Sequence, residues 1–112
     1  MRSVTFTDDA PDLEGFEILR IEGDSIESKD ELLDTIAEGF GFPDWFGRNW
    51  DALEECLRDL DAVNDGYALV ISNATAIWAE HPRISGTLVE VWLDAAADGA
   101  ERGVELRLVF EW

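Results

Sequence analysis

Three short apolar segments, separated by longer stretches with helical patterns, constrain the fold of this chain most. They lie at residues 16–21, 67–71 and 104–110, and the first alternates apolar and polar side chains. Segments of this length and pattern are typical of strands. Parallel strands need long crossover connections, and both connections here are long enough to hold helices. The order therefore predicts an α/β domain with a small three-stranded parallel sheet packed against helices.

The first connection contains two helical patterns with recognisable end signals. Ser28 and Glu31 fit a capping box at the start of a helix that Gly39 or Gly41 ends. Asn49 is a candidate N-cap for a second helix, which runs to about residue 60. The buried side of this second helix is expected to consist of Leu53, Cys56, Leu57 and Leu60.

The second connection predicts a short helix at residues 74–80 and a longer amphipathic helix from about residue 84 that Gly99 ends. Residues 1–15 have no regular pattern, although Val4 and Phe6 suit a short edge strand. We therefore divide the chain into an N-terminal extension of undetermined role, residues 1–15, and a folded domain, residues 16–112.

The composition fits one folded and strongly acidic domain. Of 112 residues, 46% are hydrophobic and 11% aromatic, which is too apolar for a disordered acidic tail. With 8 basic and 26 acidic residues, the formal net charge is -18. Such a field disfavours nucleic acids and anionic membranes as partners and favours cationic proteins. Acidity alone fits a role in solubility equally well.

The cysteine count and the lack of long apolar runs predict a cytoplasmic protein. Cys56 is the only cysteine, so no disulfide can form within the chain, as suits a reducing compartment. The N-terminus has no apolar run of signal-peptide length. No segment approaches the roughly 20 apolar residues that span a bilayer.

The sequence offers little for catalysis. His81 is the only histidine, and Cys56 falls on the apolar side of its helix, where a packed thiol is the better interpretation. Neither glycine-rich nucleotide-binding motif is present. We therefore expect neither enzymatic activity nor a cofactor.

A metal site is also not expected, although one spacing is similar to a calcium loop. Asp59, Asp61 and Asp65 have the odd spacing of such a loop, but Val63 occupies a ligand position. No glutamate falls where the bidentate ligand belongs. Solvated carboxylates are the better interpretation.

The segment at residues 41–57 has the composition of a binding surface. Trp45, Phe46 and Trp50 surround Gly47 in a loop that leads into an acidic helix. Asp51 and Glu55 are four residues apart and so share one helix face. The rings can be core residues and the acids an ordinary solvated face. An exposed Trp45 beside two carboxylates would instead form an aromatic anchor with a charged rim.

A fixed arrangement of turn, cap, aromatic and acidic residues runs through this segment: Pro43, Asp44, Trp45, Phe46, Gly47, Asn49, Asp51, Ala52, Leu53, Cys56 and Leu57. The arrangement resembles the barstar family of intracellular inhibitors of the secreted ribonuclease barnase, and the resemblance covers about residues 17–110. It implies a three-stranded parallel sheet with helices. It also implies that the loop and second helix plug the basic active site of a guanyl-specific ribonuclease, with carboxylates replacing RNA phosphates.

The resemblance implies a set of ribonuclease-binding residues: Trp45, Gly47, Asn49, Trp50, Asp51, Glu54, Glu55 and Glu80. Asp51 matches a key acid of the family, and Glu55 falls where the family has its dominant aspartate. Trp45 falls on a contact tyrosine, and Glu54 replaces a tryptophan. Glu80 is the candidate for a further acidic contact near the long helix.

The resulting expectation is a monomer that binds one basic ribonuclease or toxin domain, as an inhibitor or immunity protein. The alternative is an acidic adaptor or regulatory module that uses the same face on another basic protein. Competition with RNA or a guanine mononucleotide distinguishes the two.

Overall fold

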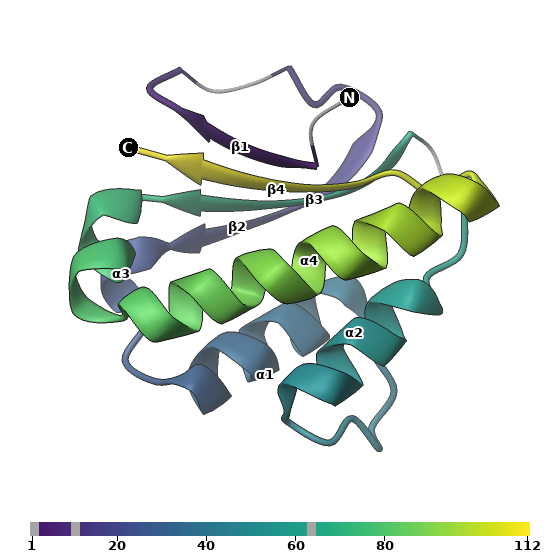
Figure 1. Ribbon diagram of the computed structural model, residues 1–112, viewed down its shortest axis with the longest axis horizontal. Coiled ribbons are helices and arrows are strands. Elements are labelled where there is room, and N and C mark those ends of the chain that lie inside the picture. Colours follow the sequence, from purple (N-terminus) through teal and green to yellow (C-terminus); the bar gives the residue numbers. More distant parts are fainter. Residues whose placement is uncertain (1–2, 10–11, 63–64) are drawn as a thin grey trace.

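The computed structural model describes residues 3–9, 12–62 and 65–112, so Val63 lies outside the described residues. Within them, the chain forms one parallel sheet with the strand order β1-β4-β3-β2 (Figure 1). The strands are β1 (Val4–Thr7), β2 (Phe16–Glu22), β3 (Gly66–Ser72) and β4 (Leu106–Glu111). The predicted α/β class and parallel pairing are confirmed.

The predicted number of strands was wrong, because the described residues form four and not three. The additional strand, β1, is the short edge strand for which Val4 and Phe6 were suited; it pairs with β4 and places Phe6 opposite Phe110. β1 has only four residues, which is too short for a clear alternating pattern. Its partner lies at the other end of the chain, and local sequence cannot reveal such a pairing.

The α-helices of the described residues lie close to where the sequence predicts them, with one error at an end, whereas the 3₁₀-helix was not predicted. They are the 3₁₀-helix η1 (Gly23–Ser25) and the α-helices α1 (Lys29–Phe40), α2 (Trp50–Arg58), α3 (Ala74–Glu80) and α4 (Pro82–Arg102). Ser28 Oγ accepts a hydrogen bond from the Glu31 amide at 3.1 Å, which confirms the N-cap of α1. Gly41 ends this helix.

The long helix α4 continues past Gly99 to Arg102 and is capped by Gly103. Gly103 has the left-handed φ of 78° that a helix-ending glycine adopts. Gly99 serves packing instead, because a Cβ there would lie 2.6 Å from the Val104 carbonyl oxygen. The prediction that Gly99 ends the helix was therefore wrong.

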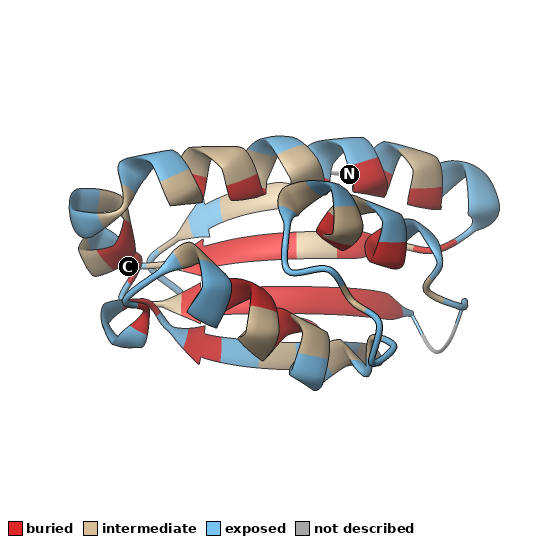
Figure 2. Cartoon of the chain, turned by 90° about the horizontal axis from the view of Figure 1, so that it is seen from below, coloured by how far each residue is buried: buried red, intermediate tan, exposed pale blue. Residues whose placement is uncertain are grey.

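The helices α1, α2 and α4 lie on one face of the sheet, and the large core fills the space between (Figure 1). Trp92 of α4 and Phe110 of β4 are the largest fully buried side chains of this core. The buried residues concentrate in the central strands (Figure 2), and β3 is buried from Gly66 to Ile71. Such a strand reads as a continuous apolar run in the sequence, as observed.

The connection from β1 to β2 runs on the other face of the sheet. Leu13 is buried there against Ala68, Val70 and Val109. The connections from β2 to β3 and from β3 to β4 cross the sheet in one direction and carry helices on one face. The connection from β1 to β2 crosses the sheet in the opposite direction and runs on the other face. All three crossovers thus have the same hand, as parallel connections require. The described part of the N-terminal segment therefore supplies both a strand and a buried side chain.

Candidate protein-binding site

The loop at residues 41–49 is held by aromatic side chains that point into the molecule. Phe42 and Phe46 pack against the core, with their ring centroids 5.5 Å apart. The Phe46 amide donates to the Pro43 carbonyl at 3.0 Å and closes a turn. Trp45, between these anchors, is 68% exposed. The prediction that Trp45 remains accessible is confirmed.

Asn49 joins the loop to α2 through hydrogen bonds of both the oxygen and the nitrogen of its side-chain amide. Its Oδ1 accepts a hydrogen bond from the Ala52 amide at 2.7 Å, which confirms the predicted N-cap. Its Nδ2 donates to the Gly47 carbonyl at 3.1 Å. The exposed backbone at Gly47 therefore has a fixed position relative to the first turn of α2.

An ion pair that the sequence analysis missed ties the same loop to α1. Arg48 Nε donates to Asp34 Oδ1 at 2.7 Å, and Arg48 Nη2 donates to Asp34 Oδ2. The hydrogen bond from Arg48 holds the pKa of the Asp34 carboxyl below its usual value. Arg48 is the only basic residue of the loop, and this was the one feature of the sequence that could have indicated an ion pair here. Its partner could not be read from the sequence.

The helix α2 separates a buried side from an acidic side. Leu53, Cys56 and Leu57 are buried as expected, whereas Leu60 lies beyond the end of α2 and is half-buried. Asp51 and Glu55 are exposed and share a face by their spacing of four. In the described residues neither acid forms an ion pair. Arg58 instead pairs with Glu54 at 3.4 Å.

The predicted contact residues differ in how much of each is available to a partner. Trp50 is half-buried and packs against the core, so only part of its ring is free to contact another protein. Glu54 is also half-buried and shares its charge with Arg58. Of the predicted aromatic and acidic contact residues in the loop and α2, Trp45, Asp51 and Glu55 are the exposed ones.

Glu80 lies apart from the other predicted residues. It is the exposed last residue of α3, which packs against η1 and α4. Figure 1 places α3 at the opposite end of the molecule from the loop and α2. The structure thus brings together seven of the eight predicted residues.

The remaining reactive groups have structural surroundings. Cys56 is buried, and burial raises the pKa of its thiol, which lowers the thiolate fraction. His81 Nε2 lies 3.1 Å from the Ile26 carbonyl oxygen. In the described part of the chain, no three His, Cys, Asp or Glu residues are grouped to hold a metal ion. Within it, too, every helix is too short or too polar to cross a membrane.

The chain was compared with known protein families and with curated proteins. A family model described as Barstar (barnase inhibitor) matches residues 16–111. This range includes β2, β3, β4 and all the helices and leaves out β1. A search of curated proteins found no match.

Proposed function

The chain belongs to the barstar family, and from this premise we propose that it inhibits a basic, barnase-like ribonuclease or toxin domain by covering its active site. The family is one of barnase inhibitors and not of enzymes. The loop at residues 41–49 and the exposed face of α2 are the proposed contact surface.

One observation carries the proposal: a loop tied down by its own contacts, and the helix that directly follows it, present an exposed indole and two exposed carboxylates without an ion pair in the described residues. Trp45 is 68% exposed, and Asp51 and Glu55 have no ion pair in the described residues. The caps and contacts of Asn49 and Arg48 hold their surroundings in place. Ordering a surface before binding reduces the entropy that association must overcome.

The proposed mechanism is electrostatic imitation of RNA. A ribonuclease active site is cationic because it binds phosphates. Asp51 and Glu55 would form charge-assisted hydrogen bonds with cations of that site, each worth about 1.5–3 kcal/mol. The net charge of -18 would accelerate encounter, and the barnase–barstar pair is itself a standard example of such steering.

Trp45 and Glu54 have different proposed roles at this interface. The Trp45 ring would supply apolar contact and exclude water from the nearby ion pairs, which strengthens them. The charge of Glu54 is partly neutralised by Arg58, so Glu54 would contribute to binding only at the rim of the interface. Glu80 would contact only a partner large enough to reach past α4 to α3.

The setting of the proposed complex follows from the same properties. The lone, buried Cys56 suits a reducing cytoplasm, where an inhibitor or immunity protein would protect the cell. We propose a monomer that binds one enzyme molecule.

The test is a titration of a guanyl-specific microbial ribonuclease of the barnase type with the purified protein. A sharp loss of activity at a one-to-one ratio, together with binding that a guanine mononucleotide competes against, is the expected result. Binding that leaves the ribonuclease active, or that a mononucleotide does not affect, would favour the adaptor function instead.

A further inference from the structure

The sheet formed by the described residues has two edge strands, β1 and β2. The edge formed by β1 has apolar side chains and lies beside the helix α4. β1 is an end strand in the order β1-β4-β3-β2. The Leu108 amide donates to Ser3 O at 2.7 Å, and the Trp112 amide donates to Thr7 O at 3.1 Å. Main-chain groups alternate in direction along a strand, so those of Val4 and Phe6 point away from β4. In the described residues no strand lies on that side.

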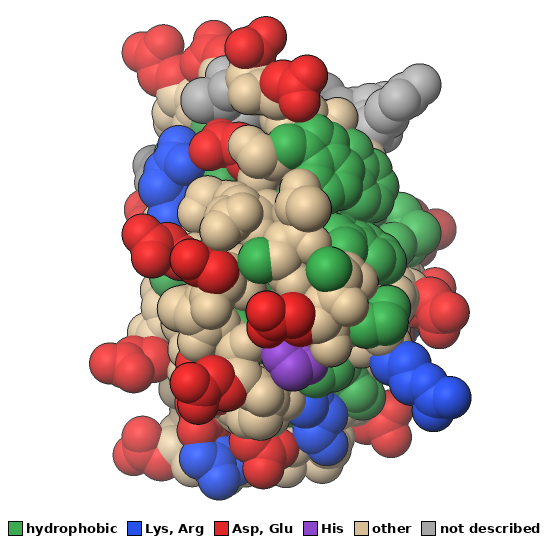
Figure 3. Space-filling model, turned by 90° about the vertical axis from the view of Figure 1, so that its left-hand side faces the viewer, with side chains coloured by type: hydrophobic (Ala, Val, Ile, Leu, Met, Phe, Trp, Pro, Cys, Tyr) green, Lys and Arg blue, Asp and Glu red, His purple; other side chains and the backbone are tan. Residues whose placement is uncertain are grey.

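Large apolar side chains are exposed beside this edge, on the side of the sheet that α4 covers. Phe6, Leu93 and Trp112 are each between 46% and 49% exposed. Phe6 stacks on Trp112 and on Phe110, with ring centroids 5.8 and 5.0 Å apart. Figure 3 shows hydrophobic side chains along its right-hand side, which is the side that faces the viewer in Figure 1, where β1 and α4 lie.

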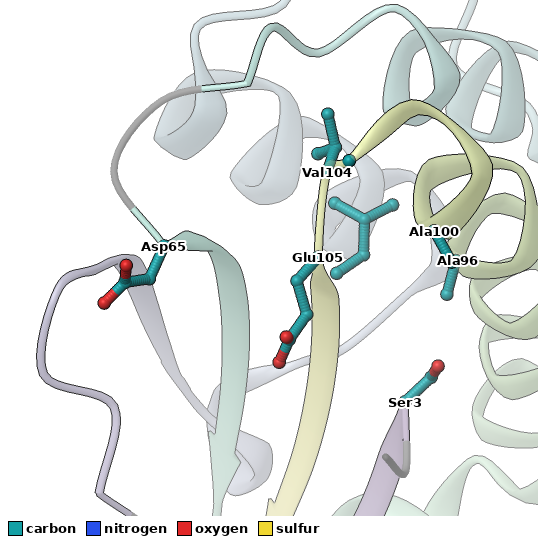
Figure 4. A pocket seen from close by; sticks show the side chains of 8 residues that line it. Ser3, Asp65, Ala96, Ala100, Val104 and Glu105 are labelled. Atoms are coloured by element: carbon teal, nitrogen blue, oxygen red, sulfur yellow. The ribbon is translucent and has the colours of Figure 1, made fainter.

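One flank of α4 continues this apolar surface. Val89, Leu93, Ala96 and Ala100 recur at intervals of three and four residues and so share one helix face. Ala96 and Ala100 line a cavity of about 350 Å³ together with Ser3, at the start of β1 (Figure 4). This face of α4 therefore looks toward β1.

Acidic side chains border the apolar surface on both sides. Asp8 and Asp9 follow β1 directly, and Glu90 and Asp94 lie next to Leu93 on the outer side of α4. All four are exposed, and none forms an ion pair in the described residues. A cationic segment complements this border. A second copy of the chain, with its own charge of -18, does not.

From this geometry we infer that the edge of β1 binds an extended segment of a partner protein as a fifth strand. Its main chain pairs with Val4 and Phe6, and its inward apolar side chains pack on Leu93 and Phe6. Lysine or arginine residues at its ends meet the acidic border. Strand addition takes affinity from main-chain hydrogen bonds and specificity from alternate side chains. The surface is separate from the proposed ribonuclease site, and the inference does not depend on that function.

The test uses a synthetic peptide of alternating valine and threonine with two lysines at each end. Amide hydrogen exchange by NMR is the readout, with affinity from the same titration. Saturable binding should slow exchange at Val4 and Phe6 while leaving Thr5, which already faces β4, unchanged. A peptide with glutamates in place of lysines, and one with a central proline, should each bind at least tenfold more weakly.

Leu93→Asp should weaken peptide binding at least tenfold. Ile18→Asp is the matched control, because Ile18 is similarly exposed on the opposite edge strand, and it should have no effect. Both variants should keep the parent's melting temperature within a few degrees. The inference is overturned by absence of binding, by equal binding to Leu93→Asp, or by shifts at α4 without protection of Val4 and Phe6. Protection of these amides by self-association without peptide overturns it too.

Discussion

Arg48 and Asp34 join the binding loop to α1 through two parallel hydrogen bonds between the guanidinium and the carboxylate. Arg48 adopts a left-handed φ of 48°, a conformation uncommon for a residue with a side chain. The pair is exposed, so its net effect on folding stability is small. Its consequence is local: the loop that carries Trp45 is tied at its far end as well as by Phe46.

We expect Arg48→Ala to weaken inhibition by loosening the loop, with the melting temperature almost unchanged. Asp34→Ala should have a similar effect, although Asp34 lies on α1, outside the proposed contact set. The double variant should then be no weaker than either single variant, because both remove the same contact. Additive losses would show that Arg48 acts on the enzyme directly and not through Asp34. Titration of ribonuclease activity measures all three.

The same pair should give Asp34 an unusual titration. Its pKa is lowered by the hydrogen bond from Arg48. A carboxyl with a lower pKa in the folded state adds stability above its unfolded pKa of about 3.9, and this contribution is lost as the pH falls through the folded pKa. NMR titration of the side-chain carboxyl carbon should show a lower midpoint in the parent than in Arg48→Ala. Equal midpoints would contradict the contact.

Asp51→Ala and Glu55→Ala should separate binding from stability. Each change leaves an enzyme cation without its partner, which typically costs about 2–5 kcal/mol of binding free energy. Both residues are exposed, so the free energy of unfolding should change by no more than about 0.5 kcal/mol. Asp24→Ala, an exposed acid on η1, is the control for net charge and should retain full affinity. Parent-like inhibition by both variants would refute these roles.

The two tryptophans of the segment should respond in opposite ways. Trp45→Ala should reduce affinity for the ribonuclease and leave thermal stability unchanged, because the ring is exposed. Trp50→Ala should lower the melting temperature, because its ring packs against the core. Inhibition assays and thermal unfolding on both variants measure the contrast. A parent-like affinity of Trp45→Ala would remove the aromatic anchor from the proposal.

The elements within residues 16–112 were predictable because their signals are local. Ser28 and Asn49 bond to backbone amides three residues ahead, and such caps can be read directly from spacing. The exposure of Trp45 was also predictable, since it lies in a turn between Pro43 and Gly47. These features depend on neighbours in the sequence.

The features that were missed depend on distant residues. β1 pairs with β4 across almost the whole chain, and Arg48 finds Asp34 on another helix. The end of α4 was misplaced because a glycine's role depends on what packs against it. Gly99 touches Val104, whereas Gly103 takes the left-handed conformation. No local pattern distinguishes these two glycines.

The N-terminal segment should prove to be part of the folded domain, and Leu13 is the position that tests this. Leu13 is buried on the sheet face opposite the helices, among Ala68, Val70 and Val109. Leu13→Ala removes apolar contacts from this small cluster and should destabilise the protein by about 2–5 kcal/mol. Chemical denaturation measures the loss.

Ile18→Ala is the matched control, because Ile18 is exposed and its truncation should have little effect. The folded fraction of Leu13→Ala should inhibit the ribonuclease as the parent does, since the binding loop and α2 lie on the other face of the sheet. An unchanged free energy of unfolding would mean that the segment contributes no stability. Lost inhibition by folded Leu13→Ala would mean that the two faces of the sheet are coupled.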